Sequence, residues 1–309
     1  MTAVVLLGPQ SLRPILVQAV DEVGVKGRVA AVTAGWEERE DEIDEMAEHL
    51  GRPVDNLMLF RRGEDVFRRD PELFLAFGDH LERRARAQDV YRVRLAHALA
   101  AVRELARGDL DPVFAKAAAA SAVDVVRDID EEHRRRVRAL RDEFEANVRP
   151  HERDAVIRHR KEIRKLLEGS EALLIAGGHV QVLLDRLRLF DVDALAGRRP
   201  VFAWSAGAMV ASEDVVLFHD APPHGPGNAE LLDQGLARCR GVLPLPQARR
   251  RLKLEDRGRV ALLAQRFAPL RCLALDEECR LTYTERGGAE VHQARELTEQ
   301  GEVRELLPA

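Results

Sequence analysis

A single serine, Ser205, interrupts the apolar run at residues 200–209 and has small residues on both sides. The run predicts a strand, a sharp turn at the serine and the start of a helix. At the tip of such a turn the hydroxyl stands clear of the sheet, and the N–H of Ala206 points to where an oxyanion would form. Of the two glycines in the general elbow pattern, Ala203 replaces the first and Gly207 is the second. The pattern indicates nucleophilic attack on a carbonyl; the alternative is an ordinary strand–helix junction whose serine caps the helix.

A second glycine-containing turn follows the apolar run at residues 171–176. Here Gly177 and Gly178 precede His179. Both turns come at the carboxyl ends of predicted parallel strands, which is the edge where α/β proteins bind ligands. An N–H of this glycine pair could therefore complete an oxyanion hole with Ala206. The alternative is a tight left-handed turn without a ligand.

Together these segments resemble the cyanophycinase and peptidase E (aspartyl dipeptidase) family, serine hydrolases with the class I glutamine-amidotransferase-like fold. The matching segments are 4–10 and 28–35 (first two strands), 175–181 (Gly-Gly-Asp-Gln loop), 205–208 (Ser-Ala-Gly-Ala elbow), and 241–247 and 273–277 (positions of the histidine and its acidic partner). The resemblance implies an α/β fold with a doubly wound, mostly parallel, flavodoxin-like sheet. It also implies a Ser205 nucleophile and no cofactor.

Two positions depart from that family. Gln247 stands where the family has its catalytic histidine, and His179 stands where the family has aspartate. Glutamine cannot accept the serine's proton, and a neutral hydroxyl needs an adjacent base. His179 is therefore a candidate for a displaced base, with Glu277 as the acid that would orient it. The alternative for His179 is a solvated loop side chain.

Further candidates flank these positions. His219 and His224, in the loop after the predicted elbow helix, are weaker candidates for the base. Arg249 begins an arginine run directly after the strand that bears Gln247, so its guanidinium could face the pocket and bind an acidic substrate. The alternative for this arginine is an exposed helix start.

Composition excludes several classes of function. The net charge of -5 arises from many charges of both signs, which is not a nucleic-acid footprint. We find no apolar run of membrane-spanning length and no signal peptide, so a cytoplasmic location is expected. Cys239, Cys272 and Cys279 lack metal-binding spacing, and none lies at the elbow. Neither a metal site nor a cysteine amidotransferase is therefore expected.

A length of 309 residues exceeds what one compact domain needs, and the middle of the chain predicts an insertion. We expect an α/β core from residues 1–60 and 168–309 and a helical insertion from 61–167. Apolar residues recur at helical spacing in two long helices: Val90, Val93, Leu99, Val102 and Leu105 in the first, and Val123, Val126, Ile129, Val137, Leu140, Phe144 and Val148 in the second. The second set, here called the seam, predicts a homodimer interface. The competing account is that the seam packs on the chain's own body.

Two functions are consistent with these patterns. The first is a serine hydrolase that acts on a small peptide or amide through Ser205, which the intact elbow and glycine loop favour. The second is a catalytically inactive binding or regulatory module that works through its helical insertion, which Gln247 favours. Neither involves a nucleic acid or a membrane.

Overall fold

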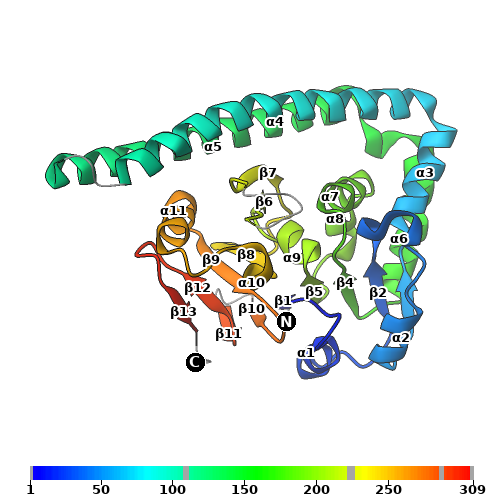
Figure 1. Cartoon of the computed structure of the whole chain (residues 1–309). Coiled ribbons are helices and arrows are strands. Elements are labelled where there is room, and N and C mark those ends of the chain that lie inside the picture. Colours follow the sequence, from blue (N-terminus) through cyan, green and yellow to red (C-terminus); the bar gives the residue numbers. More distant parts are fainter. Residues whose placement is uncertain (1–2, 107–110, 221–226, 285–288, 307–309) are drawn as a thin grey trace.

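The computed structural model describes residues 3–106, 111–220, 227–284 and 289–306 (Figure 1). Its main sheet is seven-stranded, in the order β11-β10-β1-β5-β4-β2-β3. The strands are β1 (Ala3–Leu7), β2 (Val29–Val32), β3 (Val54–Asn56), β4 (Ala172–Ile175), β5 (Val201–Trp204), β10 (Arg280–Thr284) and β11 (Ala289–His292). Strands β1 to β5 are parallel, while β10 and β11 form an antiparallel edge. The mostly parallel α/β sheet is as expected, and its flavodoxin-like type stays a prediction.

Helices cover both faces of this sheet because its central strands are apolar on both sides. Along β1, Leu6 belongs to one apolar cluster and Val5 and Leu7 belong to the other. On the face of Val5, α1 (Leu16–Val23) and α2 (Asp44–Leu50) close the core. On the opposite face lie α7 (Val180–Leu189), α8 (Val192–Ala196) and α9 (Ala206–Ala211).

Two smaller sheets extend the body. Strands β8 (Val242–Pro246) and β9 (Arg271–Leu275) are parallel and continue into β12 (Arg295–Leu297) and β13 (Val303–Glu305). Strands β6 (Asp214–Leu217) and β7 (Glu230–Gln234) form an antiparallel pair. Helices α10 (Ala248–Arg251) and α11 (Arg257–Phe267) connect β8 to β9. Within the described residues, no helix combines the length and the apolar character that a membrane crossing requires.

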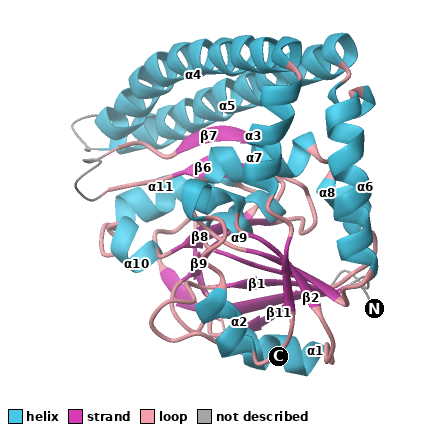
Figure 2. Ribbon diagram, turned by 90° about the vertical axis from the view of Figure 1, so that its right-hand side faces the viewer, coloured by secondary structure: helices cyan, strands magenta, loops and turns pink. Residues whose placement is uncertain are grey.

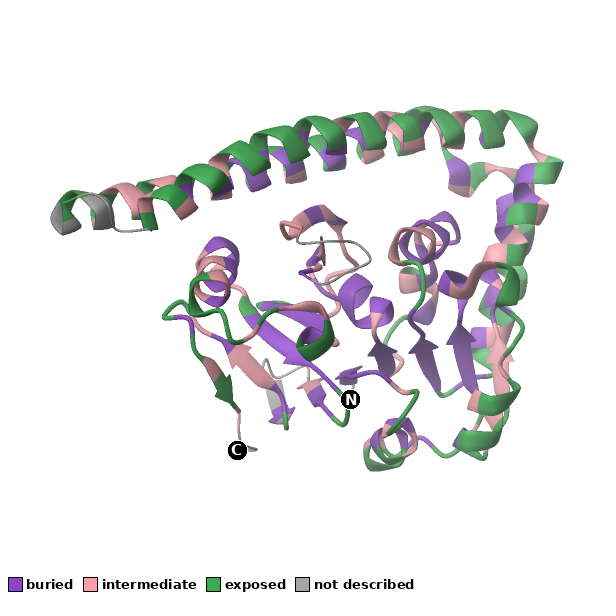
Figure 3. Cartoon of the chain, in the orientation of Figure 1, coloured by how far each residue is buried: buried purple, intermediate pink, exposed green. Residues whose placement is uncertain are grey.

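Between β3 and β4 the chain leaves the sheet and forms α3 (Leu59–Arg69), α4 (Pro71–Ala106), α5 (Pro112–Val148) and α6 (Asp154–Glu168). Helices α4 and α5 pair along their lengths and lie across the body, and we call this pair the hairpin. Figure 2 shows the hairpin above β6 and β7, with the main sheet below. Its outer face is largely exposed and its inner face largely buried (Figure 3). The hairpin and the body share one apolar cluster. The expected domain boundaries stay predictions.

The seam of α5 packs inside its own chain. Val126 is 0% exposed and Val137 is 2% exposed, and Val126 belongs to the apolar cluster that includes the main sheet. Val123 and Ile129 are buried in that cluster, Phe144 and Val148 pack against it, and Leu140 is buried as well. Because α5 lies over β7 and α11, the body covers the seam. The seam thus packs on the chain's own body, as the competing account holds, and a homodimer through the helical insertion stays a prediction.

The buried face of α4 differs in part from the expected one: Leu99 and Val102 are buried as expected, but the two valines before them are not. Val90 is 62% exposed and Val93 is 60% exposed, so the apolar spacing misidentified the buried side there. The residues that face inward are Leu73, His80, Arg84, Gln88, Tyr91, Leu95, Leu99 and Val102. Polar side chains occupy the middle of this face because their hydrogen-bonding partners lie in the body.

Buried ion pairs connect the hairpin to the body. The Arg84 guanidinium donates to the carboxylates of Asp185 on α7 and Asp233 on β7, each at 2.8 Å. Further along, Asp130 on α5 accepts hydrogen bonds from Arg266 on α11 at 2.6 and 2.7 Å. Each pair joins segments about a hundred or more residues apart, so these contacts hold the hairpin against two different parts of the body.

Two histidines are buried beside these pairs. His80 stacks on Phe144, with ring centroids 4.6 Å apart, and His133 stacks on Tyr91 at 4.1 Å. Burial disfavours the imidazolium form and lowers the pKa of each histidine to about 4. Both side chains are therefore neutral at pH 7, and His133 is the core residue that its place on the apolar side of α5 indicates.

Candidate functional site

Ser205 lies between the end of β5 and the start of α9, with φ 52° and ψ −124°. A positive φ is strained for a residue with a Cβ and costs on the order of 1–3 kcal/mol where the surroundings impose it. The Ser205 side chain is partly exposed and makes no capping hydrogen bond to α9. The alternative interpretation of this serine as a helix cap was therefore wrong, and its backbone has the sharp turn that the sequence predicts.

Close packing of glycines maintains this turn. A Cβ atom at Gly207 would overlap the carbonyl oxygen of Ile175 at the end of β4, so the first turn of α9 packs directly on that strand. A Cβ atom at Gly177 would lie 2.7 Å from the Cβ of Ser205, inside van der Waals contact. Glycine is required at both positions because the backbone of Ile175 approaches Gly207, and the Ser205 side chain approaches Gly177, too closely for a Cβ atom.

The loop from Gly177 to His179 joins β4 to α7 and lies between Ser205 and η1 (Ala34–Arg39), a short 3₁₀ helix. His179 N–H donates to the carbonyl of Gly35 at 2.7 Å, and Gly178 has φ 108°. A Cβ on Gly177 would be 3.5 Å from the backbone nitrogen of Ala206. The fold thus brings together the glycine pair, Ser205 and the N–H of Ala206, and an oxyanion hole made by them stays a prediction.

His179 is exposed and caps α7. Its Nδ1 accepts a hydrogen bond from the N–H of Val182 at 3.2 Å. A neutral imidazole that accepts at Nδ1 carries its proton on Nε2, so neither nitrogen then offers a free lone pair. For His179 to deprotonate Ser205, this cap must first be released.

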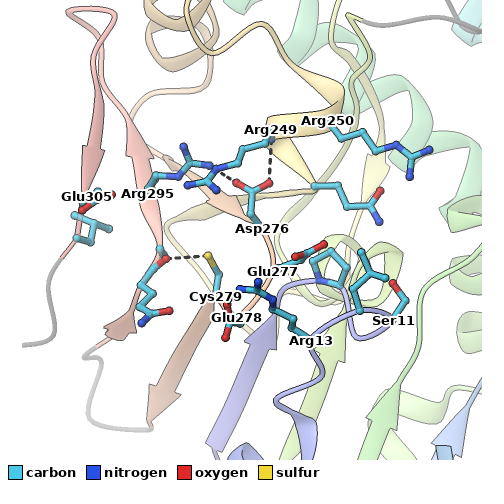
Figure 4. A pocket seen from close by; sticks show the side chains of 16 residues that line it. Ser11, Arg13, Arg249, Arg250, Asp276, Glu277, Glu278, Cys279, Arg295 and Glu305 are labelled. Carbon is cyan, nitrogen blue, oxygen red and sulfur yellow. Dashed lines mark hydrogen bonds and ion pairs between the residues drawn. The ribbon is translucent and has the colours of Figure 1, made fainter. Parts of the chain in front are cut away.

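Gln247 directly follows β8, with φ 57° and ψ 38°, and its N–H donates to the carbonyl of Leu275 at 3.0 Å. Its side chain lines a cavity of about 670 Å³ at the carboxyl ends of β1, β8 and β9 (Figure 4). Arg249 and Arg250 line the same cavity, and so does Glu277. The structure therefore groups the position of the family's histidine with the predicted arginine and acid, whereas Ser205 is not among the residues that line this cavity.

Asp276 is the first of the acidic residues that follow β9, and its carboxylate makes buried contacts. Sequence reasoning missed this residue. The Asp276 carboxylate accepts a hydrogen bond from the backbone N–H of Arg249 at 2.9 Å and forms an ion pair with Arg295. Asp276 is buried, whereas Glu277 is exposed. Two sequence signals pointed to Asp276: it lies in the segment 273–277 that resembles the position of the family's acid, and it is the first residue beyond a buried strand. Its contacts hold the start of α10, and with it the Gln247 turn, against β9.

The remaining candidates lie elsewhere. His219 follows β6 and lines a different cavity, next to the hairpin, and His224 lies outside the described residues. Within the described part of the chain, no group of His, Cys, Asp and Glu side chains could hold a metal ion. The thiols of Cys239 and Cys272 are buried, which raises the pKa of each to about 12 and leaves them poor nucleophiles at neutral pH.

Comparison with known proteins gives the fold. No family model and no curated protein matches the sequence. The crystal structure of a peptidase from an acI-B1 actinobacterium superposes with a TM-score of 0.50 at 13% identity, over 100% of this chain and 95% of that one. This chain shares its fold with a peptidase. A second crystal structure, of a candidate peptidase E from Listeria monocytogenes EGD-e, has a TM-score of 0.45 at 11% identity, over 94% of this chain and 98% of that one. At this identity the likeness concerns fold alone, so activity must be argued from the residues.

Proposed function

We propose that this protein is a serine hydrolase of the peptidase E type that acts on a small peptide or amide through Ser205. The observation that carries the proposal is the positive φ of Ser205, maintained by a turn that packs on Gly177. Backbone strain of about 1–3 kcal/mol persists only where the surrounding structure imposes it, and such residues cluster at functional sites. The cytoplasmic location and the homodimer expected from the sequence belong to this proposal.

In this mechanism the Ser205 Oγ attacks the substrate carbonyl carbon. The N–H of Ala206 and an N–H of the Gly177–Gly178 pair donate to the oxyanion that develops. Arg249 attracts an acidic group of the substrate, because a guanidinium binds carboxylates in a bidentate manner. The step that lacks an assigned residue is removal of the serine proton, which requires a base.

A second candidate is a binding or regulatory module that recognises the same small peptide or amide without turnover and works through its helical insertion. Two observations favour it. Gln247 stands where the resembling family has its base, and the Nδ1 lone pair of His179 is already engaged by the N–H of Val182. A serine without a base retains its oxyanion donors and can still bind a carbonyl compound.

A fluorophosphonate probe, which reacts with activated serines, separates the two candidates. Labelling of the wild type at Ser205, absent from Ser205→Ala, supports the hydrolase. If only the variant Gln247→His is labelled, Gln247 occupies a vacated base position and the binding module is favoured. A base typically contributes 10²–10⁴-fold to the rate, so the gain should be large.

The matched control is Gln18→His, which adds a histidine at an exposed position on α1 outside the site. Its labelling should equal that of the wild type. Failure of wild type, Gln247→His and Gln18→His alike to react, in folded protein, would contradict a Ser205-centred catalytic site of either kind.

A further inference from the structure

A second cavity, of about 930 Å³, lies between the hairpin and the body, and we call it the hairpin cavity. It shares no lining residue with the cavity at Gln247. Its walls come from the end of α4, the first half of α5, the segment after β6 and α11. Sites for small molecules in proteins measure about 300–1,000 Å³ and often lie between structural units. The hairpin cavity therefore has the size and the location of a ligand site.

Most of the cavity wall is apolar. Its buried apolar members come from segments far apart in the sequence: Leu99, Val102, Val123, Phe218, Val260 and Leu263. Such a wall favours the apolar part of a ligand, because its burial is worth roughly 25 cal/mol per Å².

The polar end of the cavity contains two guanidinium groups beside one carboxylate. Arg103 on α4 donates to the side-chain oxygen of Asn228. Arg259 on α11 donates from Nε to Asp220 at 3.0 Å and from a terminal nitrogen to the carbonyl of Gly227 at 3.3 Å. Because Gly227 and Asn228 are adjacent in the chain, the two guanidinium groups meet at the same short segment.

Among the described residues, the two guanidinium groups at this end differ in their partners. The partner of Arg103 is a neutral amide, and the nearby carboxylate of Asp220 is already paired with Arg259. Partial burial of Arg103, together with the positive charge of Arg259, lowers the pKa of the Arg103 guanidinium, and the Asp220 carboxylate opposes this effect only in part. A partly buried cation whose partner in the described part of the chain is a neutral amide is stabilised by a carboxylate that binds beside it.

Other charged groups of the lining have partners of their own. Arg127 donates to the carbonyl of Gln265 at 2.9 Å, and Arg266 pairs with Asp130. The Asp256 carboxylate accepts the N–H of Arg259 at the start of α11. Lys253 and Glu299 are exposed at the rim and oppose each other in sign. Among the described lining residues, Arg103 is thus the guanidinium whose partner is a neutral amide, whereas Arg127, Arg259 and Arg266 each pair with a carboxylate.

We propose that the hairpin cavity binds an amphipathic carboxylate, with its apolar body between α4, α5 and α11 and its carboxylate at Arg103 and Arg259. Two sources have this chemistry: a fatty acid and the C-terminus of a short apolar peptide. The inference does not depend on catalysis at Ser205, because the two cavities share no residues.

Isothermal titration calorimetry on the full chain tests the proposal with dodecanoate and with N-acetyl-Leu-Leu-Leu, whose free carboxylate ends an apolar chain. At least one should bind saturably, and the tighter of the two identifies the source. Dodecanol and inorganic phosphate, which present only one half of the chemistry, should each bind at least tenfold more weakly. Phosphate that binds as tightly as the carboxylates would overturn the amphipathic assignment.

The variant Arg103→Gln should weaken carboxylate binding at least tenfold. Its control is Arg94→Gln, on the same helix but paired with Glu132 and outside this lining. A second variant, Ala119→Phe, fills the cavity from α5, and its control is Ala117→Phe at an exposed position of the same helix. Saturable binding unchanged by both Arg103→Gln and Ala119→Phe, or no saturable binding of either carboxylate to the wild type, would overturn the proposal.

Discussion

Replacing Asp130 with alanine should loosen the hairpin from the body. The Asp130 carboxylate accepts two hydrogen bonds from Arg266, and a third from the Tyr91 hydroxyl at 2.7 Å. The variant Asp130→Ala leaves the Arg266 guanidinium, which is only 4% exposed, without its anion. Arg266 retains two hydrogen bonds, to the carbonyl of Ala229 at 2.6 Å and to the Tyr91 hydroxyl at 2.7 Å, and neither partner carries a charge.

The expected loss in the free energy of unfolding is about 3–5 kcal/mol, because removing one partner of a buried ion pair leaves an uncompensated charge. Proteins are stable by only about 5–15 kcal/mol, so this is a large fraction of the total. Asp130→Asn should lose less, because the amide oxygen still accepts a hydrogen bond while the charge is gone.

Urea unfolding followed by circular dichroism measures the effect as a lower midpoint. The matched control is Asp128→Ala, an exposed position on the same helix two residues away, which should change the free energy by less than about 0.5 kcal/mol. The reasoning is refuted if Asp130→Ala loses no more than this control, because the buried pair would then contribute nothing to holding α5 on α11.

Three further outcomes are expected. His80 and His133 have pKa values of about 4 in the folded state against 6.5 in the unfolded state. Their contribution to the free energy of unfolding is therefore present above pH 6.5 and is lost as pH falls through 4, by up to about 3 kcal/mol each. Urea midpoints measured from pH 7 to 4 should show this loss. Gly207→Ala should lower the thermal midpoint and the reactivity of Ser205, because the new Cβ overlaps the Ile175 carbonyl. The control Gly78→Ala, on α4 with open space around it, should be neutral or stabilising. Leu140→Glu should unfold the protein rather than separate two copies, since its side chain is buried inside the chain, and light scattering that shows a dimer converted to folded monomer would contradict this.

Sequence reasoning succeeded where the signal was local. The apolar run before Ser205, and the small residues after it, predicted a strand, a turn and a helix, and these are β5, a positive φ and α9. It failed on the α4 face because apolar periodicity assumes that the buried side is apolar. Arg84 and Gln88 are buried there instead, because partners on β7 and α7 satisfy them.

The sequence by itself determined the elements and the residues at their ends, including Ser205, the glycine pair and Gln247 as the departure from the resembling family. These depend on backbone propensity and on neighbours within a few positions. Only the tertiary structure decided what covers the seam, that Asp276 rather than Glu277 is held by Arg249, and that Arg103 meets Arg259. Those contacts join segments far apart in the chain, and burial and charge balance at such contacts depend on partners that no local pattern records.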